Sequence, residues 1–84
     1  MAVRLTLLVR AYCHLCDEMR AALAVYAPGV PFDEIDVDRD PALEARWGVL
    51  VPVLLADGRE ICHYRLNAHG LRDVLAPPVA ADSP

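Results

Sequence analysis

The chain has 84 residues, a length that leaves room for one hydrophobic core and therefore for one domain. Eight arginines, no lysine and twelve acidic side chains give a net charge of −4, which argues against the basic surface that nucleic-acid binding requires. The first apolar stretch, Leu5–Val9, is too short for a signal-peptide core, and no uncharged apolar stretch is long enough for a membrane helix, so we expect no membrane contact and a cytoplasmic location.

The chain begins with a strand and a helix. Apolar and polar residues alternate over Val3–Val9, which predicts a β-strand that is buried on one face and largely covered on the other. From His14 onward, apolar side chains recur every three or four residues, which predicts an amphipathic helix that Pro28 and Gly29 end. The apolar positions of this helix are Leu15, Met19, Ala22, Leu23 and Tyr26.

A second strand and a short helix follow. The strand is predicted at Phe32–Val37, where Ile35 and Val37 share one face and the acidic residue between them lies on the other. Asp40 is then placed to cap a helix that begins at Pro41. Proline suits this first helical position, because no backbone N–H is needed there. The next glycine along the chain ends this helix.

A hairpin comes next in the sequence. Extended character over Val49–Ala56, around Pro52, predicts one strand, and Arg59–Tyr64 predicts the strand that returns. Asp57 and Gly58 between them form the two-residue turn that such hairpins prefer.

The last predicted element is a helix that Asn67 caps and that runs through Leu75. We expect a single domain over residues 1–77 and a loose tail over residues 78–84. The order of elements is strand, helix, strand, helix, strand, strand, helix, which predicts a single α/β domain.

Cys13 and Cys16 form a C-x-x-C motif where the first strand leads into the first helix. The free N–H groups and the positive end of the helix dipole stabilise a thiolate on Cys13, and the thiolate is the nucleophile in disulfide exchange. Cys16 lies one helical turn further along and is placed to resolve a mixed disulfide on Cys13. A protonated His14 would favour the thiolate, whereas Asp17 and Glu18 would oppose it.

Other functions remain open for these cysteines. Cytosolic thiols are kept reduced, so closely spaced cysteines indicate catalysis or metal binding, and an odd number of cysteines fits no framework made only of disulfides. Cys62, His63 or His14 could complete a zinc site, although the second half of a zinc motif is missing. The pair could also hold an iron–sulfur cluster with a second protomer or glutathione, or be a silent pair in a partner-binding domain.

The C-x-x-C pair after the first strand, together with Val51-Pro52 before the hairpin and last helix, resembles the glutaredoxin branch of the thioredoxin superfamily. The sequence looks most similar to small bacterial glutaredoxin-like proteins with a C-H-L-C site. This resemblance implies a thioredoxin-like fold, with a four-stranded mixed sheet and helices on both faces. It also implies a thiol–disulfide oxidoreductase with Cys13 as nucleophile and Cys16 as resolving thiol.

The resemblance further implies how the site is built. Pro52 would follow a cis peptide bond and face the cysteines, and the backbone of Val51 would hold a bound thiol peptide. Arg10 would pair with a glutathione carboxylate, and Tyr12 and His14 would border the substrate.

The resemblance also implies the reaction partners. The expected substrates are protein disulfides or glutathionylated thiols, with glutathione or a thioredoxin-type reductase as the external reductant. We expect a monomer with no bound cofactor, for which glutathione is a candidate co-substrate.

The sequence departs from the glutaredoxin pattern in two places. Ile61–Leu66 lacks the Gly-Gly pair and the acidic residue that grip glutathione in that family, so glutathione as the specific partner is not implied. Between the cysteines, His-Leu stands where Pro-Tyr is usual. Cys62 is expected to be a buried, inert thiol, with a third redox thiol as the alternative. Trp47 is assigned to the core and His69 to a helix surface.

Overall fold

The computed structural model describes residues 3–75, and its elements follow the predicted order. The strands are β1 (Leu5–Val9), β2 (Phe32–Asp36), β3 (Val53–Ala56) and β4 (Arg59–His63). The helices are α1 (His14–Tyr26), α2 (Pro41–Trp47) and α3 (Ala68–Leu75), with short 3₁₀ turns η1 (Val37–Arg39) and η2 (Gly48–Leu50) on either side of α2. The predicted tail at 78–84 and the domain boundary at 77 lie outside the described residues.

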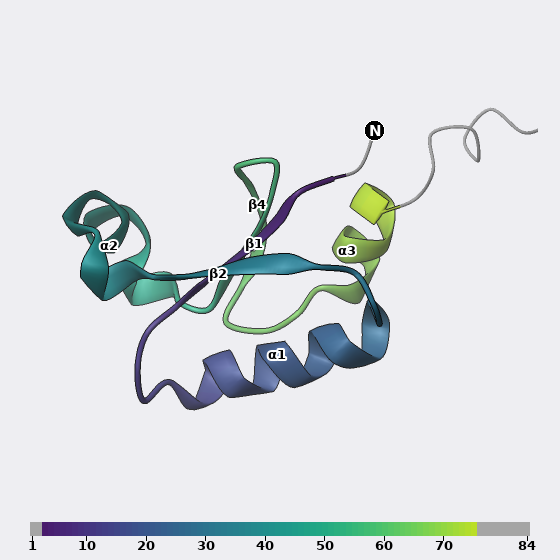
Figure 1. Cartoon of the computed structure of the whole chain (residues 1–84), viewed down its shortest axis with the longest axis horizontal. Coiled ribbons are helices and arrows are strands. Elements are labelled where there is room, and N and C mark those ends of the chain that lie inside the picture. Colours follow the sequence, from purple (N-terminus) through teal and green to yellow (C-terminus); the bar gives the residue numbers. More distant parts are fainter. Residues whose placement is uncertain (1–2, 76–84) are drawn as a thin grey trace, which may run out of the picture.

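The four strands form one mixed sheet in the order β2-β1-β3-β4, with β1 in the middle (Figure 1). β1 pairs with β2 in parallel and with β3 in antiparallel fashion, and β3 pairs antiparallel with β4. This arrangement confirms the thioredoxin-like α/β fold with a four-stranded mixed sheet. None of the helices within residues 3–75 is long and apolar enough to cross a bilayer.

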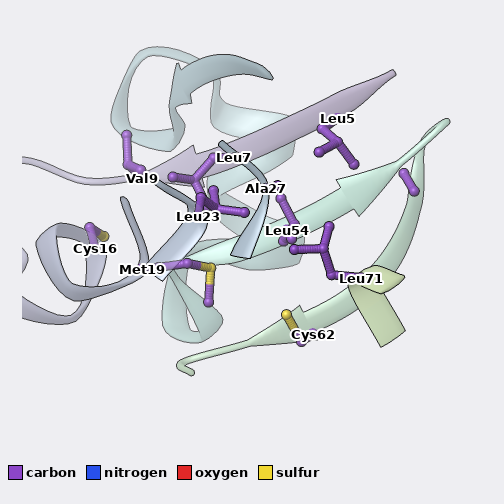
Figure 2. Packing of buried hydrophobic residues seen from close by; sticks show 11 residues of the cluster. Leu5, Leu7, Val9, Cys16, Met19, Leu23, Ala27, Leu54, Cys62 and Leu71 are labelled. Carbon is purple, nitrogen blue, oxygen red and sulfur yellow. The ribbon is translucent and has the colours of Figure 1, made fainter. Parts of the chain in front are cut away.

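Alternation along the central strands builds a core on each face of the sheet. On one face, Leu7 of β1 and Leu54 of β3 pack with side chains of α1 and α3 (Figure 2). On the other face, Leu8 and Val53 pack with Trp47 of α2, which is buried as expected. Helices therefore cover both faces, and α1 lies across the first face with its N-terminus at the end of β1.

The predicted caps and turns are confirmed. The Asp40 carboxylate accepts hydrogen bonds from two backbone N–H groups at the start of α2, at 3.0 and 3.3 Å. The Asn67 side chain accepts one from Gly70 N–H at 3.0 Å at the start of α3. Asp57 and Gly58 have φ values of 51° and 84°, the left-handed conformation that a tight two-residue hairpin turn requires.

The second strand ends earlier than predicted. Ile35 and Val37 were expected to share one face, but Ile35 is 39% exposed and Val37 is fully buried. Asp36 explains the difference, because its carboxylate accepts a hydrogen bond from the N–H of Asp38 at 2.9 Å and starts a 3₁₀ turn. This turn carries Val37 into the core beside Trp47.

Other boundaries shift by a few residues. β1 begins at Leu5 instead of Val3, and β3 begins at Val53 because Gly48–Leu50 forms a 3₁₀ turn. Tyr26, predicted on the apolar side of α1, is 62% exposed at the last position of that helix. The buried row of this helix is Cys16, Met19, Leu23 and Ala27, so Tyr26 lies beside that row and stays exposed.

Candidate functional site

Cys13 and Cys16 are joined by a disulfide, with their Cα atoms 5.2 Å apart. Cys13 lies between the end of β1 and the start of α1, and Cys16 lies in the first turn of the helix. Tyr12, directly before the pair, has a φ of 58° and a fully exposed side chain, so the chain turns sharply here. The central strand and the helix thereby fix the position of both sulfur atoms.

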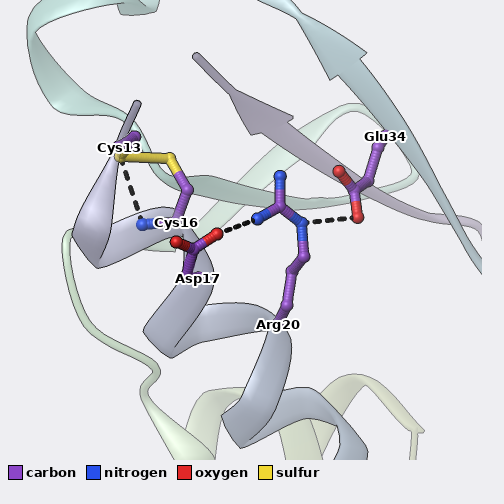
Figure 3. Close-up of polar contacts among 5 residues, drawn as sticks. All are labelled: Cys13, Cys16, Asp17, Arg20 and Glu34. Carbon is purple, nitrogen blue, oxygen red and sulfur yellow. Dashed lines mark hydrogen bonds and ion pairs between the residues drawn. A yellow bond between two sulfur atoms is a disulfide. The ribbon is translucent and has the colours of Figure 1, made fainter. Parts of the chain in front are cut away.

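Cys13 is the N-cap residue of α1. Its Sγ accepts a hydrogen bond from the backbone N–H of Cys16 at 3.1 Å (Figure 3). An acceptor at this position is stabilised by a free N–H group and by the positive end of the helix dipole. Cys13 is half-buried, whereas Cys16 is fully buried. Cys13 is therefore the more accessible residue of the pair.

The peptide bond between Val51 and Pro52 is cis, as the resemblance implied. Pro52 is buried, and its carbonyl accepts a hydrogen bond from Tyr64 N–H at 2.9 Å. Val51 and Cys13 both pack against the core cluster that contains Cys16. Val51 has an extended backbone, with φ −61° and ψ 144°, and within residues 3–75 it takes part in none of the backbone hydrogen bonds that join loops, turns and helix caps.

Arg10 is engaged by the protein itself. Its guanidinium donates hydrogen bonds to Asp38 at 3.1 Å and to Glu44 at 2.9 Å. The hydrogen bonds to Glu44 and then to Asp38 raise the pKa of Arg10 above its ordinary value. Gly48 packs so closely on the Glu44 carboxylate and the Arg10 guanidinium that a side chain there would collide with them. Arg10 thus ties the end of β1 to η1 and α2.

His14 is exposed, and its Nε2 lies 2.9 Å from the carboxylate of Glu18, one turn further along α1. Glu18 also pairs with Arg65 at 3.5 Å. His14 therefore lies beside the disulfide and faces the carboxylate of Glu18.

Sequence and structure together determine the family of the chain. The sequence model of the family described as Glutaredoxin-like domain (DUF836) matches residues 4–76. The chain belongs to this glutaredoxin-like family. Within the family match lie the disulfide, the cis proline and all four strands.

Individual proteins agree with this membership. The chain is 35% identical over 77 residues to an uncharacterised protein of Mycobacterium tuberculosis, covering 83% of this chain and 79% of that one. The solution structure of protein Ne2328 from Nitrosomonas europaea superposes with a TM-score of 0.80 at 31% identity, covering 90% and 94% of the two chains. Glutaredoxin C1 from Populus tremula x tremuloides, at 16% identity and a TM-score of 0.54 over 94% and 85%, shares the fold.

Cys62 lies in β4 opposite Leu54 and is 8% exposed, within the same core as Cys16. Burial raises the pKa of its thiol. The sequence predicted a buried thiol at this position, and the structure places it there. His69 is exposed on α3, as expected.

Tyr64 is a site residue that the sequence did not single out. It has a φ of 65°, which is rare for a residue with a bulky side chain. Its hydroxyl donates a hydrogen bond to the carbonyl of Val49 at 2.9 Å, and its N–H bonds to Pro52. The one feature of the sequence that could have pointed to Tyr64 is its position within Ile61–Leu66, the segment that departs from the glutaredoxin pattern.

The zinc site that the sequence left open has no set of ligands in the structure. Across residues 3–75, no three side chains of His, Cys, Asp or Glu converge on a point where they could hold a metal ion. In particular, Cys62 lies in the core and His63 bonds to Glu60 at 2.6 Å.

Proposed function

We propose that this chain is a thiol–disulfide oxidoreductase in which Cys13 is the nucleophile and Cys16 the resolving thiol. The observation that carries the proposal is the position of Cys13, a half-buried residue whose sulfur caps the N-terminus of α1 and accepts a hydrogen bond from the N–H of the buried Cys16. The same N–H that bonds this sulfur would stabilise the Cys13 thiolate once the disulfide is reduced.

The proposed reaction is two successive thiol–disulfide exchanges. The Cys13 thiolate attacks one sulfur of a substrate disulfide, which forms a mixed disulfide and releases the other substrate sulfur as a thiolate. The Cys16 thiolate then attacks the Cys13 sulfur, which forms the Cys13–Cys16 disulfide and releases the second substrate thiolate. Two electrons pass from the protein to the substrate, and an external dithiol or glutathione returns them.

Other residues support substrate binding in this proposal. The extended backbone of Val51, beside the cis bond to Pro52, suits a bound thiol peptide in an extended conformation. Tyr12 and His14 are exposed next to the two cysteines and would border it. The substrate class is a protein disulfide or a glutathione mixed disulfide, with glutathione also a candidate co-substrate.

The proposal is tested by replacing each cysteine in turn. With reduced protein and bis(2-hydroxyethyl) disulfide, Cys13→Ser should abolish exchange, because no exposed nucleophile remains. Cys16→Ser should accumulate a mixed disulfide on Cys13 that mass spectrometry detects, because only the resolving step is lost. Cys62→Ala is the matched control and should keep the activity, since its thiol is buried.

Two results would contradict the proposal. Full exchange activity in Cys13→Ser would remove the assigned nucleophile. Stoichiometric metal in the purified protein, released by either Cys13→Ser or Cys16→Ser, would favour a metal-binding role of the same pair.

A further inference from the structure

Three arginines lie close to the reactive pair, and each is already bound to carboxylates of the chain. Arg20 pairs with Asp17 and lies 2.8 Å from Glu34 (Figure 3). The pairs of Arg10 with Asp38 and Glu44, and of Arg65 with Glu18, are described above. A substrate carboxylate that approached these arginines would compete with an internal partner.

These arginines and the carboxylates paired with them carry a net negative charge. The three arginines are opposed by five carboxylates, which leaves a net charge of −2 when His14 is neutral. Asp17 and Glu18 directly follow Cys16 on α1, and their side chains are 73% and 46% exposed. The negative charge is therefore presented to solvent beside the reactive sulfur atoms.

An exposed aromatic ring lies next to the nucleophile. Tyr12 precedes Cys13, and its side chain is fully exposed. The face of such a ring attracts the cationic groups of lysine and arginine. Tyr12 and the carboxylates of Asp17 and Glu18 thus favour the same kind of charge in a substrate.

We propose that the site selects disulfides that carry positive charge beside the sulfur, namely cysteines in basic polypeptide segments, and disfavours glutathione mixed disulfides. This inference rests on the proposed oxidoreductase function and names its substrate class. A glutathionyl group brings two carboxylates to the site, where all three neighbouring arginines are occupied. A basic segment instead meets net negative charge, which raises its rate of productive encounter.

The experiment compares three small disulfides that differ in charge. Cystamine is cationic, bis(2-hydroxyethyl) disulfide is neutral and dithiodipropionate is anionic. Pre-reduced protein is mixed with each disulfide, and formation of the Cys13–Cys16 disulfide is followed by mass spectrometry after acid quench. Each rate is divided by that of dithiothreitol with the same compound, which removes differences in intrinsic reactivity.

At low ionic strength we expect cystamine to react about tenfold faster than dithiodipropionate, with the neutral compound between them. The difference should shrink in 0.5 M salt, because a Debye length of a few ångströms screens exposed charges. Equal corrected rates, or faster reaction of the anionic compound, would overturn the inference. Absence of exchange with all three would instead overturn the proposed oxidoreductase function, and the inference with it.

Charge-neutral variants locate the effect. Glu18→Gln should reduce the preference for cystamine about two- to threefold, because it removes a negative charge near the disulfide and releases Arg65. Asp73→Asn is the matched control, since Asp73 is exposed on α3 and lies near Arg59 and Glu60 of β4. An equal effect of both variants would show that only the net charge of the molecule matters and would overturn the assignment to this site.

Discussion

The three cysteines differ in how far they are buried and therefore in their expected reactivity. Cys13 is half-buried and caps a helix, Cys16 is fully buried, and Cys62 lies in the core beside the sheet. Removal from water disfavours the charged thiolate, and burial accordingly raises the pKa of Cys62. We therefore expect Cys62 to take no part in exchange.

The raised pKa of Cys62 predicts a dependence of stability on pH. The folded protein holds the neutral thiol, so the stability it contributes is complete below the ordinary thiol pKa of about 8.5 and is lost as pH rises toward the folded-state value. With the Cys13–Cys16 disulfide intact, urea unfolding should show a larger loss between pH 8 and 10 in the wild type than in Cys62→Val. Parallel pH profiles for the two proteins would contradict this.

At the residue scale, the sequence predicts what depends on near neighbours. The roles proposed for Cys13 and Cys16 rest on their spacing and on the strand that precedes them, and the structure shows the expected helix start. The partners of Arg10 could not be predicted, because Asp38 and Glu44 lie 28 and 34 positions away along the chain. Only the packing of η1 and α2 against the end of β1 brings these charges together.

At the scale of elements, Tyr64 connects the end of β4 to the segment that precedes β3. Its hydroxyl bonds to Val49 and its N–H to Pro52, so one residue holds both ends of the segment that carries Val51. Because Val51 is the proposed contact for a substrate backbone, Tyr64 is a positioning residue for the site.

Tyr64→Phe should weaken this connection without disturbing the fold. Loss of the hydrogen bond to Val49 should lower the free energy of unfolding by about 0.5–1 kcal/mol, the lower part of the usual range because the ring is partly exposed. It should also raise KM for a peptide disulfide more than it lowers kcat, because the Val51 backbone is less fixed. Tyr26→Phe is the matched control, since Tyr26 is an exposed tyrosine at the far end of α1. If the two variants behave alike, the positioning role is wrong.

The helices and strands could be predicted from local sequence signals, but the residues at which they end were predicted less accurately. Asp40, Asn67 and the Asp57-Gly58 turn have the predicted roles, because caps and tight turns are set by a few adjacent residues. Val37 was misplaced, because its burial depends on the side chain of Asp36 and on α2 packing over the sheet. Alternation along the sequence cannot reveal where a strand stops pairing.

At the scale of the whole molecule, the sheet explains why the reactive pair lies where it does. β1 is central and covered on both faces, and its C-terminal end delivers the chain to the N-terminus of α1. The order of strands and helices in the sequence predicted a single α/β domain, and the resemblance to glutaredoxins implied the four-stranded mixed sheet with helices on both faces. The ion pairs around the site were not predictable in the same way, since they join elements that are distant in sequence.

The most direct test of the proposed redox pair is an equilibrium titration of the intact protein in glutathione redox buffers, quenched with acid and analysed by mass spectrometry. We expect one reversible transition in which Cys13 and Cys16 gain or lose two electrons together, with a potential between about −270 and −120 mV, the range of related folds. Cys62 should stay reduced throughout, since it is buried. A Cys13–Cys16 pair that remains in one state over the whole range, or that does not return when the buffer is reversed, would contradict a redox-active disulfide.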